Sequence, residues 1–116
     1  MTKQMIATLI LVFCAISAVN ALSVNSYRDE KSDEMRKLNK AYLSGVRDGI
    51  VAVNHAIELD GKRPFFCLPN DALRFEQAED IMIERGKTSR TLDYRPVWAV
   101  LFEALKDNFP CDGPNK

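Results

Sequence analysis

Few residues of this chain have side chains that could perform catalysis. His55 is the only histidine, and Ser44 and Asp48 precede it on the same predicted helix. These three residue types could form a nucleophilic triad. However, Ser44 and His55 are 11 residues apart, which is about 16 Å along a helix that rises 1.5 Å per residue. A nucleophile must lie within hydrogen-bonding distance of its base. The sequence therefore predicts no catalytic residues and a surface position for His55.

Metal chemistry has equally little support in the sequence. One histidine and two cysteines that we expect to be bridged cannot form a zinc site without several carboxylates. Glu76, Asp80 and Glu84 recur at a spacing of four residues, but no loop carries the closely spaced acids of a calcium site. We interpret these acids as a solvated helix face, with a patch for a basic partner as the alternative. No metal and no cofactor are expected.

The N-terminus has the pattern of an export signal. Lys3 supplies the positive start, Met5 to Ile16 an apolar stretch, and Val19-Asn20-Ala21 a small-residue exit, so residues 1–21 are the predicted signal peptide. The apolar stretch is shorter than the ~20 residues of a membrane-spanning helix, and a retained anchor is the less favoured alternative. Cys14 is expected to leave with the signal, because Phe13 stands where lipoprotein processing requires a small residue.

The expected mature chain, residues 22–116, has a length that suits one domain. It has 95 residues and a net charge of −1, because removal of residues 1–21 takes away one of 16 cations and none of 16 acids. A near-neutral chain without a basic patch argues against nucleic acid as a partner. It also has no polybasic stretch that could hold the mature protein on an anionic membrane.

Two cysteines remain in this chain, Cys67 and Cys111. An even number of cysteines in an exported protein indicates a disulfide, and two cysteines allow one pairing. The two positions are 44 residues apart. The chain-entropy estimate for a loop of that length is about 4 kcal/mol, so we expect the bridge to be required for a stable fold.

Helical periodicity predicts an all-α fold, a small compact helical domain with one long-range disulfide. Ser32 can cap a first helix over 33–58, a second is expected over 71–85, and a third over 93–107 with Pro96 in its first turn. Leu22 to Lys31 is expected to be an irregular arm. The first helix has an apolar stripe that we expect to be buried, widened by Leu43 and Ile50; its members are Met35, Leu38, Tyr42, Val46, Gly49, Val53 and Ile57.

The other two helices also have an expected inner face. In the second helix it consists of Leu73, Phe75, Ala78, Ile81 and Met82, and in the third of Val97, Val100, Leu101, Ala104 and Leu105. Trp98 and Phe102 lie one turn apart on the flank of the third helix. Aromatic residues at this spacing usually belong to the core; an interaction surface is the alternative. Phe65 and Phe66 carry the same ambiguity.

Gly45 and Gly49 lie one turn apart in the first helix, where each glycine costs roughly 0.5–1 kcal/mol relative to alanine. Close approach of another helix would offset that cost. We expect the approaching helix to come from within the chain, with a second subunit as the alternative.

The order of these motifs resembles the Rap/Tai family of type VI secretion amidase immunity proteins. The matching stretches are Tyr42 to Gly49, Cys67-Leu68-Pro69, Gln77 with Asp80 to Ile83, and Pro96 through Ala104-Leu105 to Phe109-Pro110-Cys111. The resemblance implies a small helical periplasmic protein with Cys67 and Cys111 as its structural disulfide pair. Some members of the family form dimers, so a homodimer is one expectation. Residues 22–116 would then be a single immunity-type domain.

The resemblance also implies a function without catalysis. Members of the family bind and block peptidoglycan-cleaving amidases that neighbouring bacteria inject, so the expected partner is a cognate amidase effector and the protein is not an enzyme. One departure concerns the second helix. Family members often cap it with threonine, and Arg74 occupies that place here. Asn70 or Asp71 is then the expected cap, with an earlier helix start.

We expect the polar loop from Lys87 to Arg95 to enter the effector's cleft, because loops between rigid helices can reach into clefts and arginine pairs with acids. The predicted partner-binding residues are Lys87, Ser89, Arg90, Asp93, Tyr94 and Arg95, with Trp98 and Phe102 as a further interface. The alternative function is a general periplasmic chaperone activated by acid, which the apolar excess of the third helix favours. A hydrolase ranks third, since no nucleophile–base pair is evident.

Overall fold

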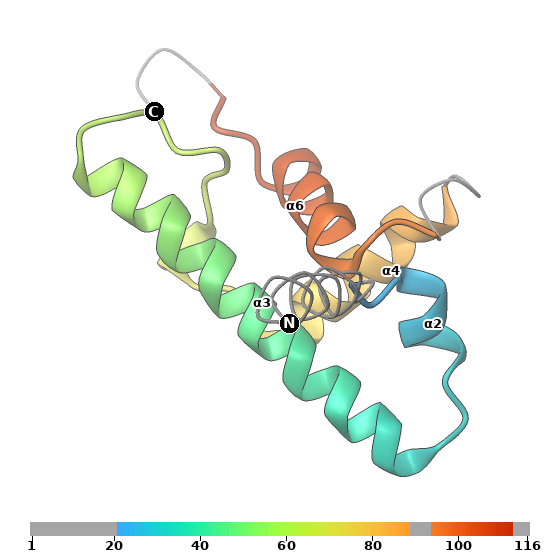
Figure 1. The fold of residues 1–116 in the computed structure, drawn as a ribbon. Coiled ribbons are helices and arrows are strands. Elements are labelled where there is room, and N and C mark those ends of the chain that lie inside the picture. The colour runs from blue at the N-terminus through green and yellow to red at the C-terminus, as the bar shows by residue number, and fades with distance from the viewer. Residues whose placement is uncertain (1–20, 89–93, 113–116) are drawn as a thin grey trace, which may run out of the picture.

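The computed structural model describes residues 21–88 and 94–112, and all its regular elements there are helical (Figure 1). Four of them are α-helices and one is a short 3-10 helix: α2 (Val24–Asp29), α3 (Asp33–Leu59), η1 (Pro69–Asp71), α4 (Phe75–Lys87) and α6 (Val97–Asn108). The all-α prediction is therefore confirmed. No helix within the described ranges is long and apolar enough to cross a bilayer. The predicted signal peptide falls almost entirely outside these ranges.

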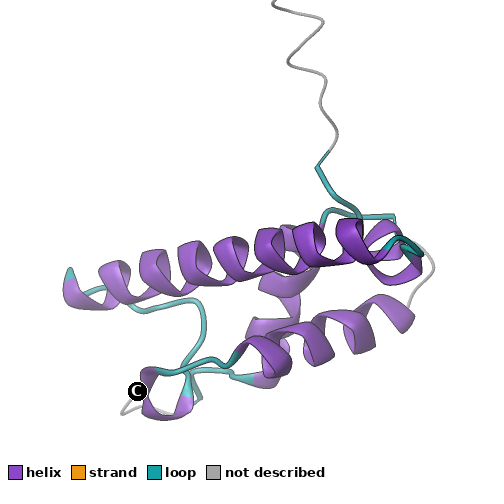
Figure 2. Cartoon of the chain, turned by 90° about the horizontal axis from the view of Figure 1, so that it is seen from below, coloured by secondary structure: helices purple, strands orange, loops and turns teal. Residues whose placement is uncertain are grey.

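The longest helix, α3, begins where the sequence predicts it. The Ser32 side chain accepts a hydrogen bond from the Met35 backbone N–H, and Asp33 and Glu34 occupy the first turn, where the helix dipole favours acids. The helix ends at Asp60, and Gly61 follows with a φ of 75°, a conformation that glycine adopts without strain. Figure 2 shows α3 along one side of the molecule, with the shorter helices on its other side.

The predicted buried stripe of α3 is wrong for most of its members, although Val46 and the widening residues Leu43 and Ile50 do pack on the core. The core side of the helix carries Asn39, Leu43 and Asn54, with Val46 and Ile50 partly buried beside them. By contrast, four side chains of the predicted stripe are exposed: Met35 is 43% exposed, Leu38 57%, Tyr42 38% and Val53 59%. The apolar residues of α3 form two adjacent sectors, and only one of them meets the rest of the chain. Helical periodicity gives the spacing of apolar residues along a stripe, but it does not show which sector of the helix surface packs against the core.

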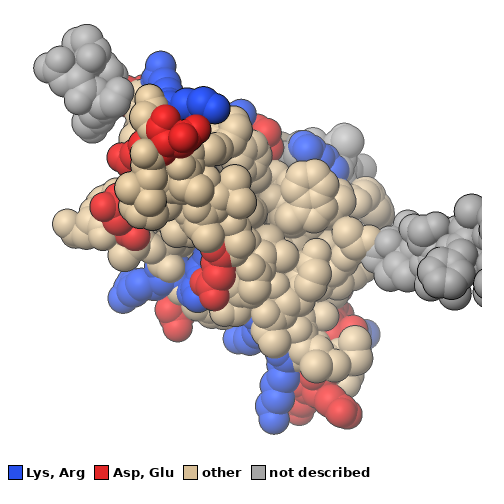
Figure 3. All heavy atoms as spheres, turned by 60° about the vertical axis from the view of Figure 1, so that its left-hand side comes forward, with Lys and Arg blue, Asp and Glu red and all other residues tan. Residues whose placement is uncertain are grey.

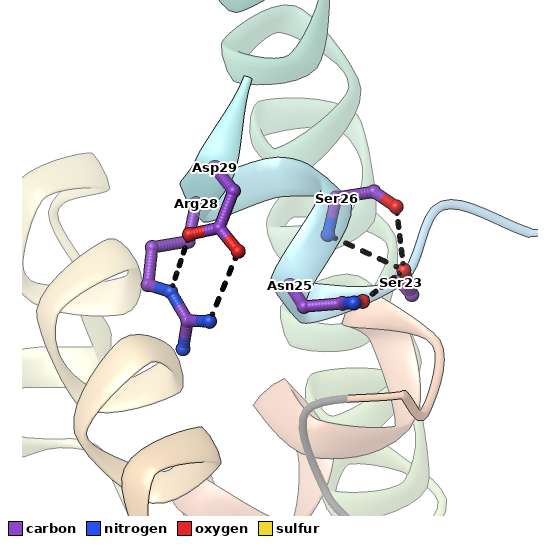
Figure 4. A network of polar contacts seen from close by, with 5 residues as sticks. All are labelled: Ser23, Asn25, Ser26, Arg28 and Asp29. Carbon is purple, nitrogen blue, oxygen red and sulfur yellow. Dashed lines mark hydrogen bonds and ion pairs between the residues drawn. The ribbon is translucent and has the colours of Figure 1, made fainter. Parts of the chain in front are cut away.

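The expected irregular arm contains a helix. Ser23 caps α2 by accepting a hydrogen bond from the Ser26 N–H, and its hydroxyl also bonds Asn25 and Ser26 (Figure 4). Val24 and Tyr27 are buried. Backbone bonds tie the arm to the start of α6, since the Val24 N–H donates to Arg95 O at 3.2 Å and the Val97 N–H to Leu22 O at 2.8 Å. A helix of six residues is too short for its two buried side chains to show a period.

Tyr27 donates its hydroxyl proton to a Glu79 carboxylate oxygen on α4, and α2 is joined to α4 by this bond. Burial, reinforced by this bond and by the negative charge of Glu79, raises the pKa of Tyr27 above its ordinary value. A raised folded-state pKa stabilises the fold below the unfolded-state value of about 10, and this stability is lost as the pH rises further.

We therefore expect the free energy of unfolding to fall above pH ~10 by up to about 1.4 kcal/mol per pH unit through this one group. The Tyr27→Phe variant should show a shallower fall. Denaturant titrations of both proteins at a series of alkaline pH values measure the difference. Absorbance titration is the control: the Tyr27 phenolate should form only as the protein unfolds, because burial raises the pKa of Tyr27. Equal slopes for the two proteins would contradict the assignment.

Helix α4 starts later than predicted. Its N-cap is Arg74, which makes no side-chain capping bond. The cap therefore lies at the position where Arg74 was expected to replace a capping threonine. The earlier start fails because Asn70 and Asp71 have φ values of 56° and 52°, which breaks the chain into the separate turn η1. Ala78 and Met82 are buried as predicted, and the helix ends one residue beyond Gly86.

Helix α6 supplies most of the core and lies against α4 and α3. Its predicted inner face is confirmed, since Val97, Val100, Leu101, Ala104 and Leu105 are all buried. The core interpretation of Trp98 is wrong, because its side chain is 51% exposed. The predicted helix start at residue 93 lies outside the described residues, and the helix proper begins at Val97, directly after Pro96.

The predicted disulfide is confirmed. Cys67 and Cys111 are bonded, with their Cα atoms 5.1 Å apart. The Cys67 N–H also donates to Phe109 O at 2.8 Å, so the segment after α3 is joined twice to the end of α6. The close intrachain approach predicted at Gly45 and Gly49 is wrong, because no described atom lies within 4 Å of a Cβ placed at either glycine.

Candidate partner-binding surface

The described ends of the predicted binding loop are both at the surface. Lys87 is the last residue of α4 and pairs with Glu84 at 2.9 Å, while Thr88 closes the helix through a bond from its hydroxyl to Arg85 O. At the other end Tyr94 is 75% exposed, and Arg95 is exposed. Ser89, Arg90 and Asp93 lie outside the described residues. The described residues on either side of 89–93 are therefore exposed, and their backbone is held by α4 on one side and by the α2 arm on the other.

Phe65, Trp98 and Phe102 are defined here as the aromatic patch. Trp98 and Phe102 come shortly after Arg95, the last residue of the predicted loop. Phe65 is 52% exposed and packs edge-on against Phe102, with ring centroids 5.2 Å apart and an interplanar angle of 76°. Trp98 and Phe102 are one turn apart on α6 and therefore neighbours on its surface. The Lys106 ammonium lies 5.5 Å from the Phe102 ring centroid. Half-exposed aromatic side chains backed by a rigid helix are typical of interface anchors.

Polar contacts fix the backbone that carries Phe65. The Asn54 side chain of α3 accepts hydrogen bonds from the N–H groups of Phe65 and Phe66 at 2.8 and 3.3 Å, and donates to Phe66 O at 2.9 Å. Phe66 itself is buried, so the two consecutive phenylalanines point in different directions. The Arg63 guanidinium bonds Cys111 O at 2.5 Å on the far side. The exposed Phe65 side chain thus extends from a backbone segment that is fixed by hydrogen bonds to α3.

A groove of about 780 Å³ runs between α3 and residues 64–73. Its apolar lining includes Val51, Phe66, Leu68 and Leu73, and its rim carries Asp48, His55, Glu58 and Asp71. The His55 side chain is 55% exposed and lies 3.9 Å from Glu58. Ser44 accepts a hydrogen bond from Arg47, so neither Ser44 nor His55 has the contact that a catalytic triad would require. In residues 21–88 and 94–112 no cluster of histidine, cysteine and acids is arranged to hold a metal ion. The acidic row Glu76, Asp80 and Glu84 is exposed, as expected.

Comparison with known protein families identifies the family of this helical, disulfide-linked chain. The sequence profile of the Rap1a immunity proteins matches residues 9–111. The chain belongs to the Rap1a immunity protein family. No curated protein and no solved structure gives a significant match. The match covers α2, α3, α4 and α6, the disulfide and the aromatic patch, so every feature described above belongs to the family domain.

Membership of the Rap1a family directs attention to surfaces that bind a protein. The sequence identified Trp98 and Phe102 as interface candidates, and the structure brings Phe65 against Phe102 from 37 positions earlier in the chain. The groove and the role of Asn54 were not predicted. A polar residue between the apolar positions Ile50 and Ile57 of a predicted helix is the signal that could have indicated Asn54, because buried amides need partners.

Proposed function

We propose that this protein is a periplasmic immunity protein that binds a type VI secretion peptidoglycan amidase effector and occludes its active site. Family membership supports immunity to a cognate effector. The disulfide supports an oxidising compartment, because such bonds are rare where thiols are kept reduced. The observation that carries the binding surface is the aromatic patch, in which Phe65 and Trp98 are half-exposed and Phe102 is partly buried between them and the core.

The patch and the loop have complementary roles in this proposal. Trp98 and Phe65 offer flat apolar area on a rigid support and would anchor the effector, since few buried aromatic residues carry most of an interface's energy. The loop from Lys87 to Arg95 ends shortly before Trp98 in the chain and would extend into the cleft. Because the described part of the chain has no nucleophile–base pair, inhibition would follow from occlusion and not from chemistry.

The test is binding of a purified peptidoglycan amidase effector to the wild type and to Trp98→Ala. Truncation of a central aromatic anchor typically costs 2 kcal/mol or more, so we expect affinity to fall by about 30-fold or more, with protection of peptidoglycan from the amidase falling in parallel. Titration calorimetry measures the first effect and cell-wall digestion the second. Thermal unfolding should be little changed, because Trp98 is half-exposed.

The matched control neutralises the exposed acidic row of α4 by Glu76→Gln, Asp80→Asn and Glu84→Gln. Full affinity of this control beside weak binding by Trp98→Ala supports the aromatic patch. The reverse pattern would contradict the patch and favour the acidic row as the contact for a basic partner.

The chaperone alternative needs apolar surface for unrelated clients. The apolar residues of α6 that favoured it are buried in the described fold, apart from the half-exposed Trp98 and the partly buried Phe102. Suppression of client aggregation at low pH, without one-to-one binding to an amidase, would support the chaperone and overturn the immunity proposal.

We also propose that the protein acts as a homodimer. The support is the exposed apolar side of α3, where Met35, Leu38 and Val53 are 43–59% exposed and no described atom lies within 4 Å of a Cβ placed at Gly45 or Gly49. Monomeric soluble proteins rarely leave large contiguous apolar patches in water, and such patches mark protein interfaces.

A further inference from the structure

One wall of the groove between α3 and residues 64–73 is a single side of α3. Asp48, Val51, His55 and Glu58 recur there at steps of three and four residues. Asp48 and Glu58 are ten residues apart, which is about 15 Å along the helix. An extended chain covers that distance in about five residues. A groove of this length, with exposed residues along both walls, suits a peptide segment better than a compact small molecule.

The lining of the groove carries an excess of negative charge. Its charged residues are Arg47, Asp48, Glu58 and Asp71. Arg47 and Asp48 are paired at 2.8 Å and compensate each other. Glu58 and Asp71 lie on opposite walls; Glu58 is 3.9 Å from His55, and neither acid has a lysine or arginine partner among the described residues. An apolar lining with two uncompensated carboxylates favours a ligand that has both apolar groups and positive charge.

Other cations near in the sequence lie outside the groove lining. Lys62 pairs with Asp60 at 3.4 Å, Arg63 bonds Cys111 O, and Arg74 is exposed on the far side of Asp71 in the chain. Figure 3 shows one side of the molecule, on which basic and acidic side chains are interspersed with uncharged surface. Charges of both signs compensate each other at a distance, so the attraction for a cation acts at short range, inside the groove.

The wall opposite α3 contains a strained turn. Asn70 and Asp71 of η1 have φ values of 56° and 52°. This region of φ costs energy for residues other than glycine, and residues that adopt it cluster at active sites and ligand-binding sites. The turn also removes Asp71 from the capping position that was expected for it, since the N-cap of α4 is Arg74. Asp71 lines the groove instead.

We propose that this groove binds an extended segment of the effector, about five residues long, with apolar side chains and at least one lysine or arginine. The inference rests on the immunity function proposed above and adds a second contact to the aromatic patch. The two surfaces share one stretch of chain, because Phe65 belongs to the patch while Pro64 and Phe66 line the groove. Asn54 holds this stretch and also lines the groove. An effector that covers Phe65 therefore meets the chain that forms the groove wall.

The first arm of the test compares variants by titration calorimetry with a purified peptidoglycan amidase. Glu58→Gln, Asp71→Asn should weaken binding by about 10-fold at low salt and by less at high salt, because two partly screened ion pairs are lost. Asparagine tolerates the positive φ of residue 71, so the turn is kept. Glu76→Gln, Asp80→Asn is the matched control, with the same charge change outside the groove lining, and should bind like the wild type.

A filling variant tests the groove without a change in charge. Ala52 is exposed on α3 and lines the groove, so Ala52→Phe should place a ring in it and lower the affinity for the amidase by about 10-fold. Ala41→Phe, at an exposed alanine of the same helix outside the lining, is the control and should bind fully. Full affinity of both groove variants, beside weak binding by Trp98→Ala, would overturn the groove while the immunity proposal stands.

The second arm measures what the groove recognises. Amide chemical shifts of the wild type are followed during addition of two probes, a five-residue peptide of alternating leucine and lysine and lysine amide alone. The peptide should shift amides of residues 51–58 and 66–73, and Ala52→Phe should abolish the response. An equal response to lysine amide would show a site for small cations and overturn the peptide groove. A wild type that binds the peptide but no amidase would overturn the effector as the source of the segment, together with the immunity proposal.

Discussion

Loss of the Cys67–Cys111 bridge is expected to lower the free energy of unfolding by about 4 kcal/mol. The estimate follows from the loop that the bond closes, whose ends are 44 residues apart, because the bond restricts the unfolded chain. Small domains have total stabilities of ~5–15 kcal/mol. The double variant Cys67→Ala, Cys111→Ala should therefore lose a large part of its stability, and its thermal midpoint should fall sharply.

The folded state adds a local reason for this expectation. The bridge joins the segment after α3 to the residues after α6, and the neighbouring contacts there are few: the Cys67 N–H bond to Phe109 O and the Arg63 bond to Cys111 O. Without the disulfide, these two hydrogen bonds and the packing of Phe65 on Phe102 would have to hold the segment after α3 against the end of α6. We expect the end of α6 and the Phe65 segment to exchange their amide hydrogens faster in the variant.

Urea titration of the wild type, the double variant and the reduced wild type measures the effect. Reduction and the double variant should agree to within about 1 kcal/mol if the bond itself is responsible. A double variant as stable as the wild type would mean that packing of α6 alone closes the domain, and the entropic argument would be wrong.

The sequence predicted the helices that have both a start signal and a long period. Ser32 marks the start of α3, and the apolar face of α6 is broad enough to be unambiguous. The short helix α2 was missed, because its fold depends on partners elsewhere: Tyr27 meets Glu79 of α4, and Val24 meets the backbone of Arg95. No local pattern carries that information.

The two errors in α3 share one cause. The stripe that includes Met35, Leu38 and Tyr42 was assigned to the core, and Gly45 was expected to face a helix of the same chain. Both expectations assumed that an apolar helix face packs within its own chain. The structure uses the adjacent sector, around Leu43, for the core and leaves the stripe exposed. An apolar face shows that something covers it but not whether the cover comes from the same chain.

The candidate site was predictable only in part. Trp98 and Phe102 were recognisable because they are one turn apart on a helix. Phe65 joins them through the tertiary fold, with Asn54 and the disulfide holding its segment in place. Spacing along the chain cannot reveal a contact between residues 37 positions apart.

Asn54→Ala is expected to cost about 3 kcal/mol, the second largest effect on stability. The Asn54 amide satisfies three backbone groups of Phe65 and Phe66, two N–H groups and one C=O. Each buried group left without a partner costs about 1–3 kcal/mol, less where water can replace the lost bond. Water can reach the half-exposed Phe65 but not Phe66, so we expect a value near the lower end of that summed range.

The chain offers a matched control for this prediction in Asn39. It lies on the same side of α3 and is 7% exposed, against 8% for Asn54, but its side chain makes no hydrogen bond to any residue that the structure describes. Asn39→Ala should cost less than about 1 kcal/mol, because no partner is left unsatisfied. Urea titration compares the two variants, and equal losses would show that burial of an amide, and not its three bonds, determines the effect.

The same variant should weaken effector binding without removing any residue of the aromatic patch. Asn54 positions the backbone of Phe65, whose ring packs on Phe102. A freed segment must be ordered again on binding, at a cost of roughly 1–2 kcal/mol for each backbone residue that is fixed. We therefore expect Asn54→Ala to bind a peptidoglycan amidase at least about 5-fold more weakly at a temperature where it is fully folded. Unchanged affinity would mean that Phe65 contributes to the core of the molecule and not to its interface.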